Sequence, residues 1–198
     1  MGLTPVPNDQ LATIVTSLEM RARPPLRPAR PSPLALVRWP APASERYRTL
    51  FRRVGGPWLW FSRLVMAEDA LRSILDNPSI EVYAATDRAG IELGMLELDF
   101  RVQGNCEISY FGLVPEITGK GNGRWMMAQT LALAWRKGVE RVWVHTCTLD
   151  HPSALGFYRH HGFTAYRRTI ETFADPRGSG ILPADAAPHI PYLGSVSR

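Results

Sequence analysis

The spacing of hydrophobic and polar positions predicts strands and helices in both halves of the chain. Mixed β-branched and apolar residues predict a first strand over Leu11–Met20, and Leu34–Trp39 predicts an edge strand. From Ser44, which suits an N-cap, apolar residues recur at helical spacing as far as Val54. A second, short helix is expected over Ala67–Leu75.

The middle of the chain changes to the pattern of strands. Ile80–Thr86, Ile91–Val102 and Cys106–Val114 read as strands, separated by turn residues at 87–90 and 104–105. Short turns between consecutive strands predict an antiparallel meander. The remaining elements expected are the helix Trp125–Arg136, the strand Arg141–Thr146, the helix Ser153–His161 and the strand Phe163–Phe173.

The two ends differ in composition from this core. Residues 21–42 are rich in proline and arginine, a composition hostile to regular structure, and residues 174–198 are rich in Pro, Gly and Ala. We therefore expect an N-terminal strand and Pro/Arg-rich extension over residues 1–43, a folded core over 44–173 and a wrapping tail over 174–198. The extension could cover a site or mediate dimer contacts, so a homodimer is left open.

Composition and charge exclude several classes of protein. Of the 198 residues, 45% are hydrophobic and 21% charged, as in globular domains. No apolar run approaches the ~18–20 residues that span a bilayer, and no signal peptide is recognisable, so we expect a cytoplasmic protein without membrane contact. The net charge of +5 is dispersed rather than gathered with aromatics in a stripe, which argues against nucleic-acid binding.

Metal and thiol chemistry are also disfavoured. The cysteines Cys106 and Cys147 form no CxxC motif. His145, Cys147 and His151 lack a fourth ligand and a recognised metal spacing, so no metal site is expected.

A glycine-rich segment suggests a phosphate site. Gly119, Gly121 and Gly123 alternate between a strand and a helix, where unpaired amides and the helix dipole favour an anion, and Lys120 and Arg124 add positive charge. The spacing fits neither a Walker A loop, because Gly121 follows Lys120, nor a GxGxxG dinucleotide fingerprint. A flexible helix entry would look similar, so the ligand stays open on this pattern alone.

Two motifs resemble a known family. Thr118-Gly119-Lys120-Gly121-Asn122-Gly123 is similar to the Arg/Gln-x-x-Gly-x-Gly/Ala signature of the GNAT superfamily of N-acetyltransferases, with Thr118 as the departure. The segment 154–163 resembles the family's second signature, Ala-x-x-aromatic/Leu-Tyr-x-x-x-Gly-Phe. The resemblance covers about residues 44–173. It implies an α/β acyl-CoA N-acyltransferase fold, with a mixed, mostly antiparallel sheet that is splayed near Val114 and flanked by helices.

The resemblance also implies acetyl-CoA as cofactor and assigns roles to residues. The backbone of Leu113 and Val114 would pair with the pantetheine arm, and an amide near Leu113 would polarise the thioester carbonyl. Tyr158 matches the tyrosine that protonates the departing thiolate. The family's Asn before the second signature is His151 here, so Asp150 or His151 would contact the arm. The implied cofactor-binding set is Leu113, Val114, Thr118, Gly119, Lys120, Gly121, Asn122, Gly123, Arg124, Asp150, His151, Ala154 and Phe157.

The general base is expected on the strand before the glycine loop. An amine must lose a proton to attack, and a carboxylate can take it, often through water. Glu107 stands where the superfamily's histone-acetylating members carry their base, although a solvated charge at a strand end is an equal explanation. Strict alternation would place Glu107, Ser109 and Phe111 on one face, and Ile108, Tyr110 and Gly112 on the other.

Other residues are candidates for the acceptor side. Glu97 and Asp99 share one face of the neighbouring strand and could bind a cationic amine, whereas an exposed sheet face explains them nearly as well. Trp58 and Trp60 could form a pocket wall, Tyr110 could border it, and His145 could serve as an alternative proton acceptor.

The expected reaction is direct transfer of acetyl from acetyl-CoA to a primary amine of a small molecule or peptide, within a ternary complex. Transfer of a longer acyl group is an alternative, as is a non-catalytic acyl-CoA sensor. The sequence specifies neither the acceptor nor the acyl length.

Overall fold

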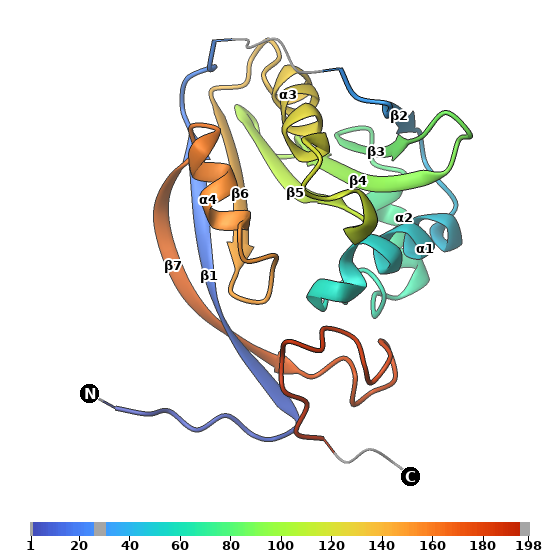
Figure 1. Cartoon of the computed structure of the whole chain (residues 1–198). Coiled ribbons are helices and arrows are strands. Elements are labelled where there is room, and N and C mark those ends of the chain that lie inside the picture. The colour runs from blue at the N-terminus through green and yellow to red at the C-terminus, as the bar shows by residue number, and fades with distance from the viewer. Residues whose placement is uncertain (1, 26–30, 195–198) are drawn as a thin grey trace.

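The computed structural model describes residues 2–25 and 31–194 of the chain (Figure 1). Part of the Pro/Arg-rich extension, residues 26–30, and the end of the tail, residues 195–198, lie outside the described residues. Within the described part, no helix has the length and apolarity needed to cross a membrane.

The described residues form a seven-stranded sheet in the order β2-β3-β4-β5-β6-β1-β7. The meander β3–β4–β5 is confirmed, and every neighbouring pair is antiparallel except β5 and β6, which are parallel. The predicted mixed, mostly antiparallel sheet is therefore confirmed. The strands are β1 Gln10–Met20, β2 Ala35–Trp39, β3 Ile80–Thr86, β4 Glu92–Asp99, β5 Asn105–Leu113, β6 Arg141–Cys147 and β7 Thr164–Ala174.

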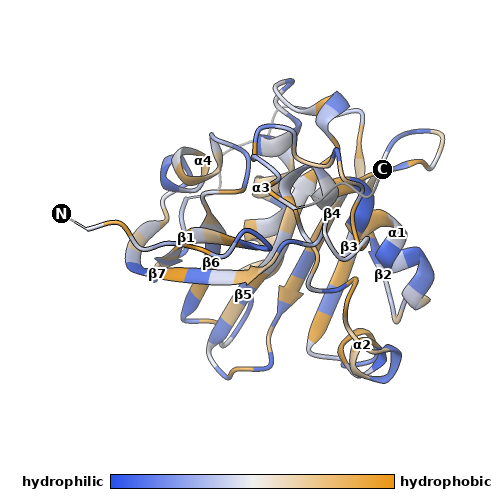
Figure 2. Ribbon diagram, turned by 90° about the horizontal axis from the view of Figure 1, so that it is seen from below, coloured by the Kyte–Doolittle hydropathy of each residue, from blue (hydrophilic) through white to orange (hydrophobic). Residues whose placement is uncertain are grey.

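Helices cover both faces of the sheet (Figure 2). On one face, α1 Ser44–Gly55 and α2 Glu68–Leu75 pack on a core that includes Phe51, Leu71 and Met95. On the other face, α3 Asn122–Ala134 and α4 Ala154–His160 bury residues such as Met126, Met127 and Leu98. Two short 3₁₀ turns, η1 Gly56–Trp58 and η2 Pro115–Ile117, follow α1 and β5.

Parallel strands β5 and β6 pair over only part of their length. Their register runs from Asn105 opposite Arg141 to Ile108 opposite Val144 and then stops. Residues 109–113 of β5 continue alongside β4 instead, so β5 and β6 diverge from this point (Figure 1). This divergence is the splay that the family resemblance implied near Val114, and its origin lies five residues earlier.

Two predicted boundaries are wrong for local reasons. The helix expected over Trp125–Arg136 begins at Asn122, because Gly121 at φ +84° serves as its N-cap and allows the turn to start inside the glycine loop. The strand expected over Ile91–Val102 ends at Asp99, whose carboxylate accepts the Arg101 amide at 2.9 Å and so begins a turn.

The predicted faces of β5 are also wrong, because the strand contains a β-bulge. Glu97 pairs with Tyr110 and Leu98 with Ile108, which leaves Ser109 as an extra residue. Tyr110 therefore shares a face with Glu107 and packs toward α1. Phe111 turns to the opposite face, where it meets the rings of Phe157 and Tyr158 on α4.

The C-terminal segment is built into the fold by a buried ion pair. Arg177 donates to the Asp175 carboxylate at 2.7 Å and to the Ile190 carbonyl at 2.8 Å, so one guanidinium ties together both ends of residues 175–190. Leu182 packs on Leu59, just after η1. The segment thereby packs against the loop that carries Trp58.

Candidate active site

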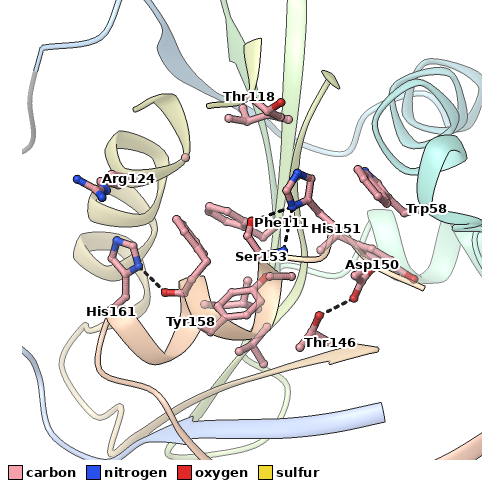
Figure 3. A pocket seen from close by; sticks show the side chains of 18 of the residues that line it. Trp58, Phe111, Thr118, Arg124, Thr146, Asp150, His151, Ser153, Tyr158 and His161 are labelled. Atoms are coloured by element: carbon pink, nitrogen blue, oxygen red, sulfur yellow. Dashed lines mark hydrogen bonds between the residues drawn. The ribbon is translucent and has the colours of Figure 1, made fainter. Parts of the chain in front are cut away.

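A cleft of about 1890 Å³ opens where β5 and β6 separate. Its walls come from the diverging ends of these strands, the glycine loop, α3, α4 and the η1 loop. Figure 3 shows Arg124 and His161 on one side of the cleft, Trp58 on the other, and Tyr158 and Phe111 between them. Leu113, Tyr158 and all of the loop residues from Thr118 to Arg124 line the same cleft.

The peptide group of Leu113 lies at the cleft edge of β5. The Val114 amide donates to the Leu93 carbonyl of the β4 side at 2.9 Å. Because successive peptide groups of a strand point in opposite directions, the Leu113 amide points away from β4, into the space that β6 has left. An extended chain such as pantetheine can add to this edge as a further strand would. Val114 itself is 1% exposed and packs toward α1, so only its backbone is relevant.

The glycine loop presents a row of amides at the far end of that edge. Gly119 and Gly121 have φ values of +75° and +84°, which favour glycine. The first hydrogen bond of helix α3 is donated by the Trp125 amide to the Gly121 carbonyl at 3.1 Å. The amides of the three preceding residues, 122–124, therefore have no acceptor within the helix. Asn122 turns its side chain inward to the Ile117 carbonyl at 3.0 Å, which stabilises the loop rather than a ligand.

Two exposed cations lie in the glycine loop and at the start of α3. Thr118, Lys120 and Arg124 are exposed, and the Lys120 ammonium donates to the Glu116 carbonyl at 3.1 Å. The Thr118 hydroxyl donates to the Pro115 carbonyl, so this side chain closes the 3₁₀ turn. Its backbone remains part of the cleft, which agrees with the substitution at this position of the motif. An anion at the start of α3 would meet amides, a helix dipole and two cations.

Tyr158 occupies the inner wall of the cleft. It is 6% exposed and surrounded by Phe111, Phe157 and Phe163. Its hydroxyl has no hydrogen-bond partner among the described residues, although its side chain lines the cleft. Burial raises the pKa of the Tyr158 phenol well above its ordinary value, and the negative charge of the nearby Asp150 carboxylate makes a smaller contribution in the same direction. The phenol is therefore held in its protonated, proton-donating form.

Asp150 and His151 stabilise the loop between β6 and α4. The Asp150 carboxylate accepts the Thr146 hydroxyl at 2.7 Å, the Cys147 amide at 2.8 Å and the Trp60 indole N–H at 3.2 Å. The His151 Nδ1 accepts the amide of Ser153, at the start of α4, at 3.1 Å. Both residues line the cleft, so a contact with the pantetheine arm remains a prediction.

An aromatic wall faces the strands across the cleft. Trp60 packs on Phe51 and Tyr110, and Trp58 lies edge-on to His151 with ring centroids 5.1 Å apart. A Cβ atom on Gly112 would come within 3.1 Å of the Trp60 ring, so the glycine lets the indole lie against β5. Tyr110 also lines the cleft, and its hydroxyl bonds the Ser62 hydroxyl at 2.6 Å.

The two acidic residues of β4, Glu97 and Asp99, each form an ion pair with an arginine. Glu97 is fully buried, and its carboxylate accepts Arg63 Nη2 at 2.7 Å and the Tyr47 hydroxyl at 2.5 Å. Asp99 accepts the Arg101 guanidinium at 2.6 Å. Neither carboxylate lines the cleft: Glu97 lies behind Tyr110, its partner on β5, and Asp99 borders a separate small cavity.

Glu107 and His145 meet where the strands begin to separate. Glu107 Oε1 lies 3.8 Å from His145 Nδ1, on neighbouring strands β5 and β6. Burial, with smaller contributions from the charges of Asp99 and Glu97, raises the pKa of the Glu107 carboxyl to about 7. The two residues line different cavities: His145 belongs to the main cleft, whereas Glu107 borders a small cavity beside Asp99 and Trp143.

Sequence reasoning missed the contribution of the outer strands. Thr13 and Val15 on β1, and Glu171 and Phe173 on β7, line the open end of the cleft. Phe173 stacks on Phe61 of the aromatic wall, with ring centroids 4.9 Å apart. Alternation could show that these residues share a face of each strand, but only the non-local pairing of β1 with β6 and β7 brings that face to the cleft.

Comparison with protein families gives a match that agrees with this geometry. The profile of the Acetyltransferase (GNAT) family matches residues 45–163, more than half of the chain, including the glycine loop and Tyr158. The chain belongs to the GNAT acetyltransferase family. A comparison with curated proteins finds no significant match.

Several solved structures share the fold at low sequence identity. A functionally unknown conserved protein from Staphylococcus epidermidis has a TM-score of 0.58 at 14% identity, with 84% of this chain and 63% of that chain covered. An aminoglycoside acetyltransferase from an uncultured soil metagenomic sample has a TM-score of 0.56 at 19% identity, with 70% and 93% covered. A GCN5-related N-acetyltransferase from Sphaerobacter thermophilus has a TM-score of 0.55 at 18% identity, with 87% and 52% covered. The GNAT chain described here thus spans about half to two thirds of the length of the first and third of these proteins.

Proposed function

We propose that this GNAT protein transfers acetyl from acetyl-CoA to a primary amine of a small molecule or peptide, by direct transfer in a ternary complex. The observation that carries the proposal is one continuous cleft. It runs from the cleft-facing peptide group of Leu113 to the amides of the glycine loop, with the Tyr158 side chain on its wall.

The residues of the cleft suit the donor from end to end. Acetyl-CoA, when bound, supplies a thioester whose carbonyl carbon is open to attack by an amine. The Leu113 amide would hold the thioester oxygen, and the amides from Gly119 to Arg124 would hold the pyrophosphate beside Lys120. Tyr158 would donate its phenolic proton to the departing sulfur, since a phenol is protonated near neutral pH and the raised pKa of Tyr158 leaves it so.

Removal of the amine proton is assigned to Glu107 acting through His145. The histidine lines the main cleft and the carboxylate lies behind it at 3.8 Å. A carboxyl with a pKa of about 7 is a better base near neutral pH than an ordinary one, because about half of it is still ionised and the ionised form binds the proton more tightly. The proton would pass from the amine to His145 and on to Glu107.

The open end of the cleft suits an amphipathic amine. Trp58, Phe61 and Phe173 provide apolar surface there, and Asp150 and Glu171 provide negative charge. The positive residues Lys120 and Arg124 belong to the opposite, glycine-loop end. An amine with an apolar body would therefore be favoured over an anionic acceptor.

Two measurements test the proposal together. Isothermal calorimetry with acetyl-CoA should show binding to the wild-type protein, and release of free thiol should be detected with at least one member of an amine panel that includes aminoglycosides. Absence of acetyl-CoA binding would overturn the donor assignment. Binding without thiol release across the panel would favour the acyl-CoA sensor, and turnover with longer acyl-CoA but not acetyl-CoA would correct the acyl group.

A further inference from the structure

The outer edge of β7 is long and open. The strand runs for 11 residues at the end of the sheet, and Figure 1 shows it at the margin of the molecule. Within the described residues, β7 has a partner strand only on its β1 side. Ile170 is 77% exposed, and Ile14, its partner on β1, is 46% exposed. An edge of this length, with apolar side chains, is a template for another strand.

The hydrogen bonds of β1 show which peptide groups of β7 face outward. The Thr148 amide donates to the Ile14 carbonyl at 3.2 Å, so the peptide group of Ile14 points toward β6 and away from β7. Its β7 partner Ile170 must then point away from β1 as well. The Asp175 amide, which donates to the Asp9 carbonyl at 2.9 Å, confirms the alternation at the end of the strand. Arg168, Ile170 and Thr172 therefore present their backbone groups to the outside.

A second copy of the same strand matches this edge in one particular register. An antiparallel pair related by a two-fold axis at Thr169 places Arg168 of one copy opposite Ile170 of the other, and both of these have outward peptide groups. The same axis places Arg167 opposite Glu171, once on each side. Shifting the axis to Arg168 would set two arginines against each other, and shifting it to Ile170 would leave Glu171 opposite Thr169.

The side chains on both faces of such a pair are compatible. Arg167 and Glu171 would occupy non-hydrogen-bonded positions, where opposite side chains approach most closely and charge pairing contributes most. Neither residue forms an ion pair within the described part of the chain. On the other face, Ile170 of each copy would lie beside the aliphatic part of Arg168 of the other copy, which removes an exposed apolar side chain from water.

We propose that two copies of this chain associate through β7, antiparallel and centred on Thr169, to form one continuous sheet across the dimer. Because Glu171 lines the open end of the cleft, the pairing also brings Arg167 of the second copy to the rim of each cleft. The association depends on the strand edge and its charges, and it does not depend on the proposed acetyl transfer.

Sedimentation velocity of the full chain tests the association. The wild type should sediment as a dimer of about twice the 22.2 kDa chain mass. Arg167→Glu and Glu171→Arg should each convert two attractive pairs into two repulsive ones and raise the dimer Kd at least about tenfold. An equimolar mixture of the two single variants should recover the dimer, because the two acidic side chains of one variant then face the two basic side chains of the other. The double variant, in which the two charges are exchanged within one chain, should recover it as well.

Arg88→Glu is the matched control for Arg167→Glu, since this exposed residue lies in the turn between β3 and β4 and its reversal changes the net charge by the same amount. It should leave the dimer unchanged. Circular dichroism of every variant checks that the exposed substitutions leave the fold intact. A wild type that stays monomeric at high concentration would overturn the proposal. Single variants that dimerise like wild type, or a mixture that stays monomeric, would overturn the register and with it the assigned interface.

Discussion

Replacing Arg63 by methionine should destabilise the fold strongly, because it removes the partner of a fully buried carboxylate. Glu97 is 0% exposed, and the Arg63 side chain that lies 2.7 Å from it is 13% exposed. Removing one member of a buried ion pair costs about 3–5 kcal/mol. The Tyr47 hydroxyl still donates to the other Glu97 oxygen, so we expect the lower end, about 3 kcal/mol. In a chain of this size that corresponds to a fall in Tm of roughly 10 °C.

Urea unfolding, monitored by tryptophan fluorescence, measures this loss of stability. Two further variants serve as a control and as a rescue. Arg46→Met breaks the ion pair between Arg46 and Glu92, in which the two side chains are 59% and 30% exposed. Because the pair is solvated, the variant should lose no more than about 1 kcal/mol of stability. Combining Arg63→Met with Glu97→Leu should recover most of the stability, because the unpaired charge is gone. If Arg63→Met costs no more than Arg46→Met, then the Glu97 carboxylate is not confined as the structure has it, and its supporting role behind Tyr110 must be abandoned.

Three further outcomes are expected at the cleft. Tyr158→Phe should lower kcat by about 10²–10⁴-fold while calorimetry shows little change in acetyl-CoA affinity, because the hydroxyl is assigned to the departing sulfur; unchanged turnover would remove that assignment. In wild type, kcat/KM for the amine should rise with pH through about 7 as Glu107 ionises, and Glu107→Gln should abolish that inflection. The raised pKa also means that Glu107 stabilises the fold at acidic pH, with this contribution lost as pH rises from about 4.3 through 7, so the Gln variant should show a flatter unfolding profile. Gly121→Ala, at φ +84°, should weaken acetyl-CoA binding about tenfold through roughly 1–2 kcal/mol of backbone strain, whereas Gly156→Ala on α4, where a Cβ meets nothing within 4 Å, should leave it unchanged.

The sequence predicted the positions of helices and strands along the chain better than the pairing of strands in the sheet. The meander β3–β4–β5 follows from short turns, which are local, and it was predicted correctly. The insertion of β1 between β6 and β7 joins residues more than 120 positions apart, and no local pattern encodes it. That pairing is what carries Glu171 and Phe173 to the cleft, so the open end of the site was not predicted.

A single extra residue explains the error on β5. Alternation was counted through Ser109 as if the strand were regular, and every later side chain was therefore assigned to the wrong face. In the structure, Tyr110 faces α1 and Phe111 faces α4, the reverse of the predicted faces, although both residues line the cleft. The assignment of the Leu113 backbone to the pantetheine arm stays a prediction, and the bulge does not affect it, because it depends on the peptide direction fixed by the Val114 hydrogen bond rather than on the face of a side chain.

The motifs could assign residues to the proposed donor end because the chemistry of that end is local. Glycines at positive φ, amides at a helix start and exposed cations lie within one short segment, so the sequence shows them together. The Glu97 carboxylate could not be judged in this way. Its alternation on β4 was correct, but the arginine that occupies it comes from the loop after η1, 34 residues earlier.

The departure at positions 150 and 151 has a consequence for the proposed acid. Where the family has Asn, this chain has His151, and the acidic neighbour Asp150 ties Thr146 and Trp60 to the loop that leads into α4. Its negative charge adds to burial in raising the pKa of Tyr158, so the phenol resists ionisation and cannot serve as a base. A donor held in this state requires a separate acceptor for the amine proton, which must come from another part of the cleft. The Glu107–His145 pair on the neighbouring strands β5 and β6, with a carboxyl pKa of about 7, is the arrangement in the described residues that fits this requirement.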